Sequence, residues 1–449
     1  MFDAESVSCH AAVQGRLSHS RAGGFRLAEH EPFIWPAPWC ILSRMTDAVL
    51  YPRFALPRLK DALADTPVVL VHGPRQCGKT TLARQVGDAA GYTYVSFDDD
   101  VTLAAAQADP VGFVADLPDH AVLDEVQRAP SLFMAIKTAV DRNRAPGRFI
   151  LTGSANVLLV PRLADSLAGR LEILRLHPLA QSELARKTPR FLEALFGAAF
   201  TVRRAERLGA ELAERIVAGG YPAALARASA RRRTAWYRDY VETLIQRDVR
   251  DLAKISALDA LPRLLQLAAG QTARLLNVAD LAAPFQLSRP TIRDYVTLLE
   301  RIFLLERLPP WHSNRLSRLV KTPKLHLGDT GLAAALHGHD AQALLKDRAT
   351  LGPLLETFVY QELRRQASWQ DDAIAFHHFR DKDGAEVDIV LERSGHQVAG
   401  VEVKTAATVT LADFRGLRKL KDATGQRFAG GVVLYDGETS AGFGEGFYA

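Results

Sequence analysis

Short apolar runs alternate with amphipathic stretches between residues 66 and 176 of this 449-residue chain. The runs TPVVLVH, YTYVSFDD, HAVLDEV, RFILTGS and LEILRL are typical of buried strands, and residues 79–90 have the apolar spacing of a helix. Strands that alternate with helices predict a parallel sheet covered on both faces. We therefore expect an α/β domain whose ligands bind at the carboxyl ends of its strands.

Helical spacing dominates the middle of the chain, from residue 178 to about residue 302. Helices are predicted at residues 261–273, 277–285 and 288–302, with Asn277 and Ser288 as caps, and a strand at 303–311. This order resembles a winged helix-turn-helix, whose third helix enters the DNA major groove. Arg289, Thr291 and Arg293 would then face DNA, although winged helices also bind proteins, and the sequence leaves both partners open.

Four charged residues near the C-terminus form a second pattern. Residues 351–366 read as an amphipathic helix with Glu356, residues 376–393 as a hairpin with Asp388, and residues 397–406 as a strand with Glu402 and Lys404 on one face. This succession is similar to the PD-(D/E)xK nuclease fold. Glu356, Asp388 and Glu402 would bind Mg²⁺, and Lys404 would orient water or neutralise phosphate charge. Inactive relatives that only bind remain an alternative.

The two histidines of the predicted hairpin, His377 and His378, are expected on the strand surface rather than in a metal site.

The loop GPRQCGKTT fits the pattern G-x-x-x-x-G-K-[ST] between a predicted strand and a predicted helix. Its glycines let the backbone approach an anion, and the helix N-terminus favours negative charge. Lys79 would reach the terminal phosphates of ATP, and the Thr80 hydroxyl would ligate Mg²⁺. The predicted ATP-binding residues are Gly73, Pro74, Arg75, Gln76, Cys77, Gly78, Lys79, Thr80 and Thr81.

Polar residues stand at the ends of the following strands. Asp124 would hold Mg²⁺ through water, and Glu125 would orient and deprotonate the attacking water, although acidic pairs at strand ends are also commonly just solvated. Ser154 or Asn156 could reach the γ-phosphate, whereas Thr152 and Gly153 are expected to form the turn.

Two further charged residues have alternative roles. Asp98 could face the same crevice or cap a helix. Arg170 could be an arginine finger, within its own chain or toward a second copy, or an ordinary surface arginine.

Composition and charge limit the class of protein and its possible partners. Hydrophobic residues make up 48% and charged residues 24%, as in ordinary globular proteins, and no apolar run is long enough to span a membrane. A net charge of +5 permits nucleic-acid binding without requiring it. Cys9, Cys40 and Cys77 offer no disulfide framework or paired ligand spacing, which favours a cytoplasmic location.

Four segments, GPRQCGKTTL, VLDEVQRAP, ILTGS and SLAGR, together resemble the bacterial and archaeal AAA-superfamily ATPases that have a C-terminal domain of uncharacterised function. The resemblance continues through GGYP, RDV and LGDTGLAAAL. It implies a P-loop ATPase fold with ATP and Mg²⁺, and the usual roles for Lys79, Thr80, Asp124 and Glu125. Cys77 replaces a small or branched apolar residue, so the loop is expected to bind ATP and to be sensitive to thiol reagents.

The expected organisation has five parts: a disordered tail or mis-assigned start at 1–44 with Met45 as the true start, an ATPase core at 45–177, a helical lid at 178–260, a winged-helix-like domain at 261–325 and a nuclease-like α/β domain at 326–449. The leading hypothesis is an ATPase that couples hydrolysis to binding or cleavage of DNA or RNA, and that can assemble as a homo-oligomer. The alternative is a nucleotide-controlled switch that binds a protein through the winged-helix region and has an inactive nuclease fold.

Overall fold

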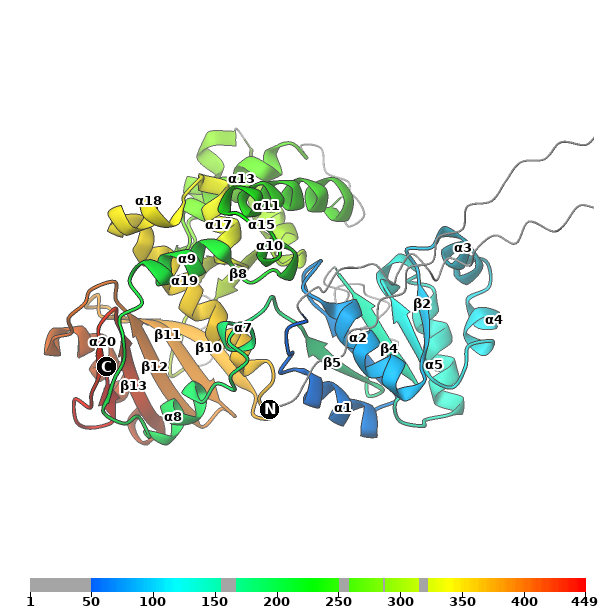
Figure 1. Cartoon of the computed structure of the whole chain (residues 1–449), viewed down its shortest axis with the longest axis horizontal. Helices are drawn as coiled ribbons and strands as arrows, with labels where there is room; N and C mark the ends of the chain where they lie inside the picture. Colours follow the sequence, from blue (N-terminus) through cyan, green and yellow to red (C-terminus); the bar gives the residue numbers. More distant parts are fainter. Residues whose placement is uncertain (1–49, 155–166, 250–257, 286, 315–321) are drawn as a thin grey trace, which may run out of the picture. The chain divides into compact units, whose positions relative to one another are not determined.

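Five parallel strands form the first sheet of the computed structural model (Figure 1). They are β1 (Val68–His72), β2 (Thr93–Ser96), β3 (Ala121–Asp124), β4 (Phe149–Gly153) and β5 (Leu171–Arg175), in the order β2-β3-β4-β1-β5. The structure describes residues 50–449, apart from 155–166, 250–257, 286 and 315–321. The hypotheses about residues 1–44, Met45 and Asn156 therefore lie outside the described residues.

Helices cover both faces of this sheet, as the alternating pattern predicts. Val69 and Val71 of β1 pack with α1 (Leu56–Asp65) and α2 (Lys79–Gly87). Val68 and Leu70 of the same strand pack with α3 (Asp100–Ala108), α4 (Pro110–Ala115) and α5 (Leu132–Arg142). Successive side chains of a strand point to opposite faces, so both faces of β1 are apolar and buried.

A mostly helical region follows, and two of its helices, α14 and α15, begin at the predicted capping residues. It comprises α7 (Gln181–Leu184), α8 (Phe191–Gly197), α9 (Ala210–Ala218), α10 (Pro222–Leu225), α11 (Ala230–Leu244), a π-helix at Ile245–Val249, α13 (Ala260–Gly270), α14 (Val278–Ala282) and α15 (Arg289–Arg301). Asn277 accepts the Ala279 N–H at 3.0 Å, and Ser288 accepts the Thr291 N–H at 3.2 Å. These hydrogen bonds satisfy N–H groups that a helix start leaves free.

Strands β7 (Arg274–Leu275), β8 (Leu305–Leu308) and β9 (Lys324–Leu327) form a small antiparallel sheet in the order β7-β9-β8. One hydrophobic cluster runs from Ala213 to Phe358 and includes side chains of α9, α11, α13, α15 and α19. The proposed boundaries at 260/261 and 325/326 therefore do not separate hydrophobic cores.

The C-terminal region has a mixed sheet. Helices α17 (Thr330–His337), α18 (Ala341–Lys346) and α19 (Arg348–Ala367) precede β10 (Ile374–Arg380), β11 (Glu386–Arg393), β12 (Gln397–Val403), α20 (Arg415–Thr424), β13 (Phe428–Leu434) and β15 (Phe447–Tyr448). The strand order is β10-β11-β12-β13-β15; β10, β11 and β12 are antiparallel, and β13 runs parallel to β12. The predicted hairpin, helix and strand are thus present.

Two expectations about this region are wrong. His377 and His378 are buried, because β10 packs against other elements on the faces where these imidazoles lie. Helix α8, placed in the lid by sequence, packs its Leu192 and Leu195 against Ile389 of the C-terminal sheet. Among the described residues, no helix combines the length and the hydropathy that a membrane span requires.

A buried ion pair joins the helical and C-terminal regions. Asp329, just before α17, accepts hydrogen bonds from Arg365 of α19 at 3.1 Å, Tyr237 of α11 at 2.9 Å and the Gly220 N–H at 2.8 Å. Arg365 also donates to Glu362 at 2.7 Å. Both partners of the pair are almost fully buried, at 3% and 0% side-chain exposure, so each charge depends on the other.

Replacement of Arg365 by methionine should destabilise the protein by about 3–5 kcal/mol, because Asp329 and Glu362 would remain buried without their cation. Urea unfolding followed by circular dichroism measures the change. The matched control is Arg215→Met, which removes an exposed pair with Glu211 on one face of α9 and should cost about 0.5 kcal/mol or less. Equal losses in the two variants would contradict the role given to Arg365.

Candidate functional site

The loop of residues 73–78 connects β1 to α2 at the carboxyl edge of the parallel sheet. A Cβ at Gly73 would overlap the Leu176 carbonyl oxygen, and Gly78 has φ +100° at the N-cap of α2. Only glycine fits both positions without strain. Lys79 opens α2, and its ammonium donates to the Pro74 carbonyl at 2.9 Å within the same loop. The loop thus brings its backbone, a helix N-terminus and the Lys79 side chain together, as an anion site requires.

Asp124, the last residue of β3, accepts three side-chain hydroxyl groups. Thr80 donates to it at 2.9 Å and Tyr94 at 2.8 Å, and Thr152 donates to the same oxygen as Thr80. The carboxylate is 5% exposed. Burial, followed by the hydrogen bond to Asp124, raises the pKa of Tyr94 to about 12, so the phenol stays a donor at neutral pH.

Glu125 lies beside Ser154, as the strand-end pattern predicts. Ser154 Oγ donates to Glu125 Oε2 at 2.9 Å, and the Gln127 side-chain amide donates to both residues. Glu125 has φ +56°, an uncommon conformation for a residue with a side chain. Its backbone N–H donates to Thr152 Oγ1 at 3.2 Å. The hydrogen bonds from Ser154 and Gln127 hold the Glu125 carboxylate through its Oε2 atom.

Residues that sequence reasoning missed complete this arrangement. Tyr94 and Gln127 were not singled out, and Thr152 is not simply turn structure, because its hydroxyl bridges Asp124 and the Glu125 N–H. The available signal was position for two of them: Thr152 lies near the end of β4, and Gln127 lies three residues after the end of β3, whereas Tyr94 lies inside β2.

The donor set fits Mg²⁺. The hydroxyl of Thr80 and the carboxylate of Asp124 lie 2.9 Å apart beside the loop, and hard cations prefer such oxygen ligands.

The helical region contacts the loop directly. Tyr240 of α11 donates to the Arg75 carbonyl at 2.9 Å, and the Arg75 guanidinium lies 3.4 Å from Asp248 of the π-helix. Next to Asp248, Arg247 donates to Asp98 at 3.1 Å. Single π-helical turns occur frequently at functional sites. This segment therefore connects the loop with the carboxyl end of β2.

Asp98 does not cap a helix. The cap of α3 is Asp99, which accepts the Thr102 N–H at 2.8 Å. Asp98 instead binds Arg128 at 2.9 Å and Arg247 at 3.1 Å.

Arg170 lies at the other edge of the sheet. It precedes β5, whose first residue pairs with Val68 at the start of β1, whereas the loop follows the end of β1. Its Nε donates to Asp141 at 2.6 Å. The proposed finger role within its own chain is therefore not supported by this geometry, because the strand length separates Arg170 from the loop. A role toward a second copy stays a prediction.

The C-terminal charged residues do come together, but around a lysine. Lys324 of β9 donates to Glu356 at 2.7 Å and to Asp388 at 3.1 Å, and Lys404 donates to Glu402 at 2.7 Å. Burial, together with Asp388, raises the pKa of Glu402 to about 7. Burial alone would lower the pKa of Lys324, but Asp388 and Glu356 raise it, so the ammonium stays charged.

Two of the three carboxylates predicted to bind Mg²⁺, those of Glu356 and Asp388, accept hydrogen bonds from the Lys324 ammonium in this structure. Within the described ranges, no three or more His, Cys, Asp or Glu residues are arranged to hold a metal ion.

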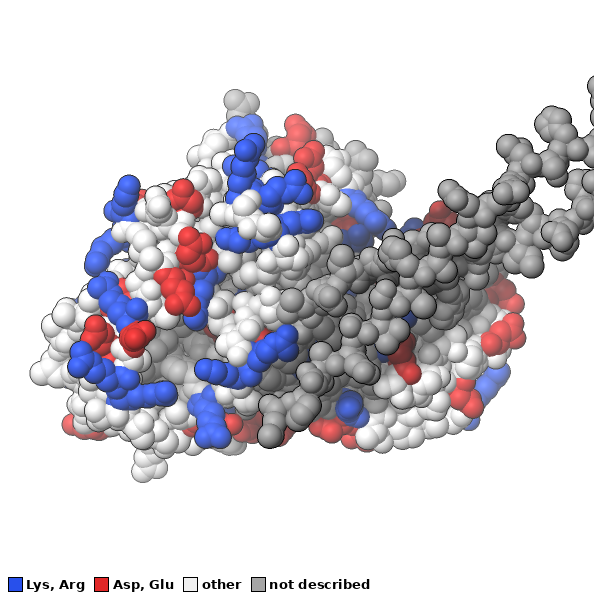
Figure 2. Space-filling view, viewed as in Figure 1, with Lys and Arg blue, Asp and Glu red and all other residues white. Residues whose placement is uncertain are grey.

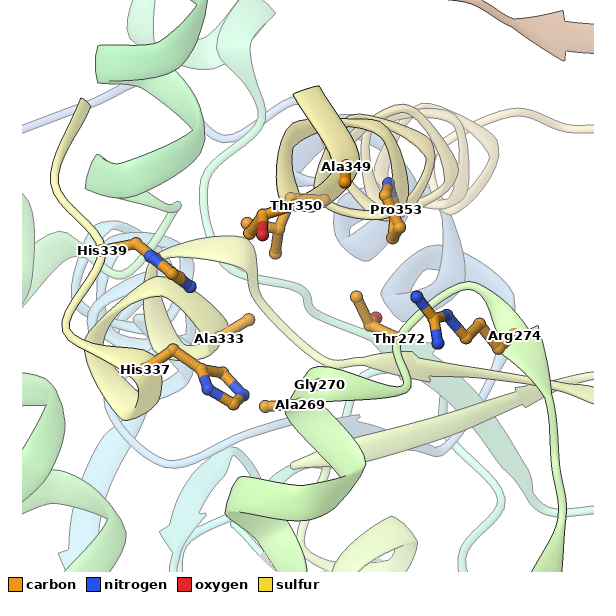
Figure 3. A pocket seen from close by; sticks show the side chains of 11 residues that line it. Ala269, Gly270, Thr272, Arg274, Ala333, His337, His339, Ala349, Thr350 and Pro353 are labelled. Atoms are coloured by element: carbon orange, nitrogen blue, oxygen red, sulfur yellow. The ribbon is translucent and has the colours of Figure 1, made fainter. Parts of the chain in front are cut away.

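A separate cavity of about 250 Å³ lies between α13, α17 and the start of α19 (Figure 3). Arg274, His337, His339 and Thr350 are among the residues that line it. None of the predicted site residues does so.

Comparisons with known proteins match three parts of the chain to separate family models. Residues 65–185 match a family model described as an AAA domain. Residues 209–343 and 351–449 match domains of unknown function, DUF8612 and DUF4143.

Relatives that match most of the chain occur in mycobacteria. Uncharacterized proteins of Mycobacterium tuberculosis and Mycobacterium bovis are each 31% identical over 399 residues, which cover 88% of this chain and 82% of the relative. A Walker-type ATPase of Pyrococcus abyssi has 15% identity and a TM-score of 0.41, over 64% of this chain and 96% of that chain.

Cys77 should resist thiol reagents, contrary to the expectation from sequence. Its side chain is fully buried, Sγ donates to the Leu176 carbonyl at 3.4 Å, and burial raises the pKa of the thiol. Since the thiolate is the reactive species, a Cys9→Ser/Cys40→Ser protein should react with Ellman's reagent only after urea is added. Full reaction within minutes under native conditions would contradict this burial.

Proposed function

This chain belongs to the family of AAA-domain proteins that includes the two mycobacterial relatives, and we propose that it hydrolyses ATP with Mg²⁺ at the loop of residues 73–80. The observation that supports this proposal best is the pairing of Asp124 with Thr80 and of Glu125 with Ser154 at adjacent strand ends. Phosphoryl transfer needs positioning and charge neutralisation, and these groups supply both.

Each residue has a distinct role in the proposed reaction. The backbone of the loop and the Lys79 ammonium bind the β- and γ-phosphates. Thr80 and Asp124 hold Mg²⁺, which neutralises phosphate charge. Glu125 accepts the proton of the attacking water, while Ser154 and Gln127 orient its carboxylate.

We also propose a path by which nucleotide binding at the loop affects the helical region. Arg75 stands in the phosphate-binding loop and contacts both Tyr240 and Asp248. A shift of the loop around ATP would alter both contacts. Arg247, held by Asp98 and next to Asp248, would sense the γ-phosphate in this proposal.

Coupling to nucleic acid is the second part of the proposal. Arg289 and Arg293 are exposed one turn apart at the start of α15, and neither has an ion pair among the residues that the structure describes. Lysine and arginine side chains also gather over the region of α11 (Figure 2). Unpaired cations on a helix start are suited to phosphate and base contacts.

Replacement of Glu125 by glutamine should lower the ATP hydrolysis rate by about 10²–10⁴-fold, because general base catalysis contributes that much. ATP affinity, measured with a fluorescent analogue, should stay within about twofold. The control is Glu172→Gln on β5, a partly exposed carboxylate outside the site, which should keep full activity. Unchanged hydrolysis in the Glu125 variant would assign the base elsewhere.

Replacement of Arg289 and Arg293 by alanine should weaken DNA binding and reduce the slope of log affinity against log salt by about 2, because each cation neutralises one phosphate. Fluorescence anisotropy with labelled duplex and single-stranded DNA and RNA measures the slope. The charge-matched control is Lys60→Ala/Lys187→Ala, two exposed lysines outside α15. Salt-insensitive binding that neither variant changes would favour the protein-binding switch.

A further inference from the structure

Five charged side chains from four elements meet in the C-terminal region. Lys324 comes from β9, Glu356 from α19, Asp388 from β11, and Glu402 and Lys404 from β12 and its end. Lys324 is the outlier, because β9 belongs to the small sheet with β7 and β8 and not to the sheet of β11 and β12. The cluster is therefore assembled across two sheets.

Both oxygens of Asp388 are already used. Oδ1 accepts Lys324 Nζ at 3.1 Å, and Oδ2 accepts the Val403 backbone N–H at 3.0 Å. Glu356 Oε1 accepts the same ammonium at 2.7 Å. The lysine therefore lies between the helix carboxylate and the strand carboxylate, where a divalent cation shared by them would have to bind.

The cluster is buried enough for its charges to depend on one another. Side-chain exposure is 7% for Lys324 and 13% for both Glu356 and Asp388, whereas Lys404 is 35% exposed. Charged groups are almost never buried to this extent unless they are paired. A metal could enter only if Lys324 left, and that ammonium would then need another partner or a path to water.

We propose that Lys324 is the resident cation of this cluster, so that the C-terminal domain binds no divalent metal between Glu356 and Asp388 and does not cleave nucleic acid by a metal-dependent route. The inference is independent of ATP hydrolysis at the loop and of the contacts of Arg289 and Arg293.

The proposal predicts that removal of one amino group creates a metal site. Lys324→Met keeps the length and apolar stem of the side chain while it frees the carboxylates of Glu356 and Asp388. Electron paramagnetic resonance can count the Mn²⁺ bound per chain, in an Asp124→Asn background that removes the carboxylate of the ATP site. We expect no bound Mn²⁺ with Lys324 present, one per chain in Lys324→Met, and none after Asp388→Asn is added.

A lysine outside the cluster provides the matched control. Lys419→Met on α20 removes an exposed ammonium that pairs with Asp383, and it should gain no Mn²⁺. The proposal is overturned if the protein with Lys324 intact binds Mn²⁺ that is lost in Glu356→Gln or Asp388→Asn. It is equally overturned if folded Lys324→Met gains no site.

Loss of Lys324 also leaves buried carboxylates unpaired, so the variant could unfold. In that case thermal unfolding is measured with EDTA and with Mn²⁺. Because a ligand that binds only the folded state stabilises it, Mn²⁺ should raise the Tm of Lys324→Met and leave that of Lys419→Met unchanged. A Tm of Lys324→Met that does not respond to Mn²⁺ would overturn the proposal.

Discussion

The ion pair between Asp329 and Arg365 is the interaction on which the arrangement of the helical and C-terminal regions depends. Asp329 binds Tyr237 and the Gly220 N–H, while Arg365 binds Glu362 and the Leu179 carbonyl. A buried charge without its partner is strongly destabilising. The helices that supply these groups are therefore stable only when they pack together. The motifs GGYP and LGDTG and helix α19 therefore form one structural unit.

The phosphate-binding loop is connected to this unit through a single turn of α11. Tyr237 donates to Asp329, and Tyr240, three residues later on the same face of the helix, donates to the Arg75 carbonyl. Trp236 stacks on Tyr240 with ring centroids 4.9 Å apart and restricts its movement. A displacement of the loop would therefore act on Tyr240, which lies one turn of α11 from Tyr237 and its hydrogen bond to Asp329. These contacts are the physical basis of the coupling that we propose.

The sequence predicts what is local, and misses what depends on distant segments. The loop, the strand-end residues Asp124, Glu125 and Ser154, and the helix caps follow from spacing and side-chain chemistry, and the structure brings these residues together. Lys324 could not be found this way, because it reaches Asp388 across 64 positions and from another sheet. The position of Arg170 could not be predicted from its neighbours in sequence either. It lies at the edge of the sheet opposite the loop because Leu171, the next residue, pairs with Val68 at the start of β1.

Two adjacent arginines of α19 bind acidic residues from two different parts of the chain. Arg365 binds Asp329, whereas Arg364 lies 3.5 Å from Glu306 of β8, which also binds Arg175 at the end of β5. The residue after Arg175 is Leu176, whose carbonyl oxygen lies against Gly73 of the loop. Glu356, which Lys324 holds, stands two turns earlier on α19. Helix α19 is thus linked through Glu306 to the end of β5 and through Glu356 to the C-terminal cluster.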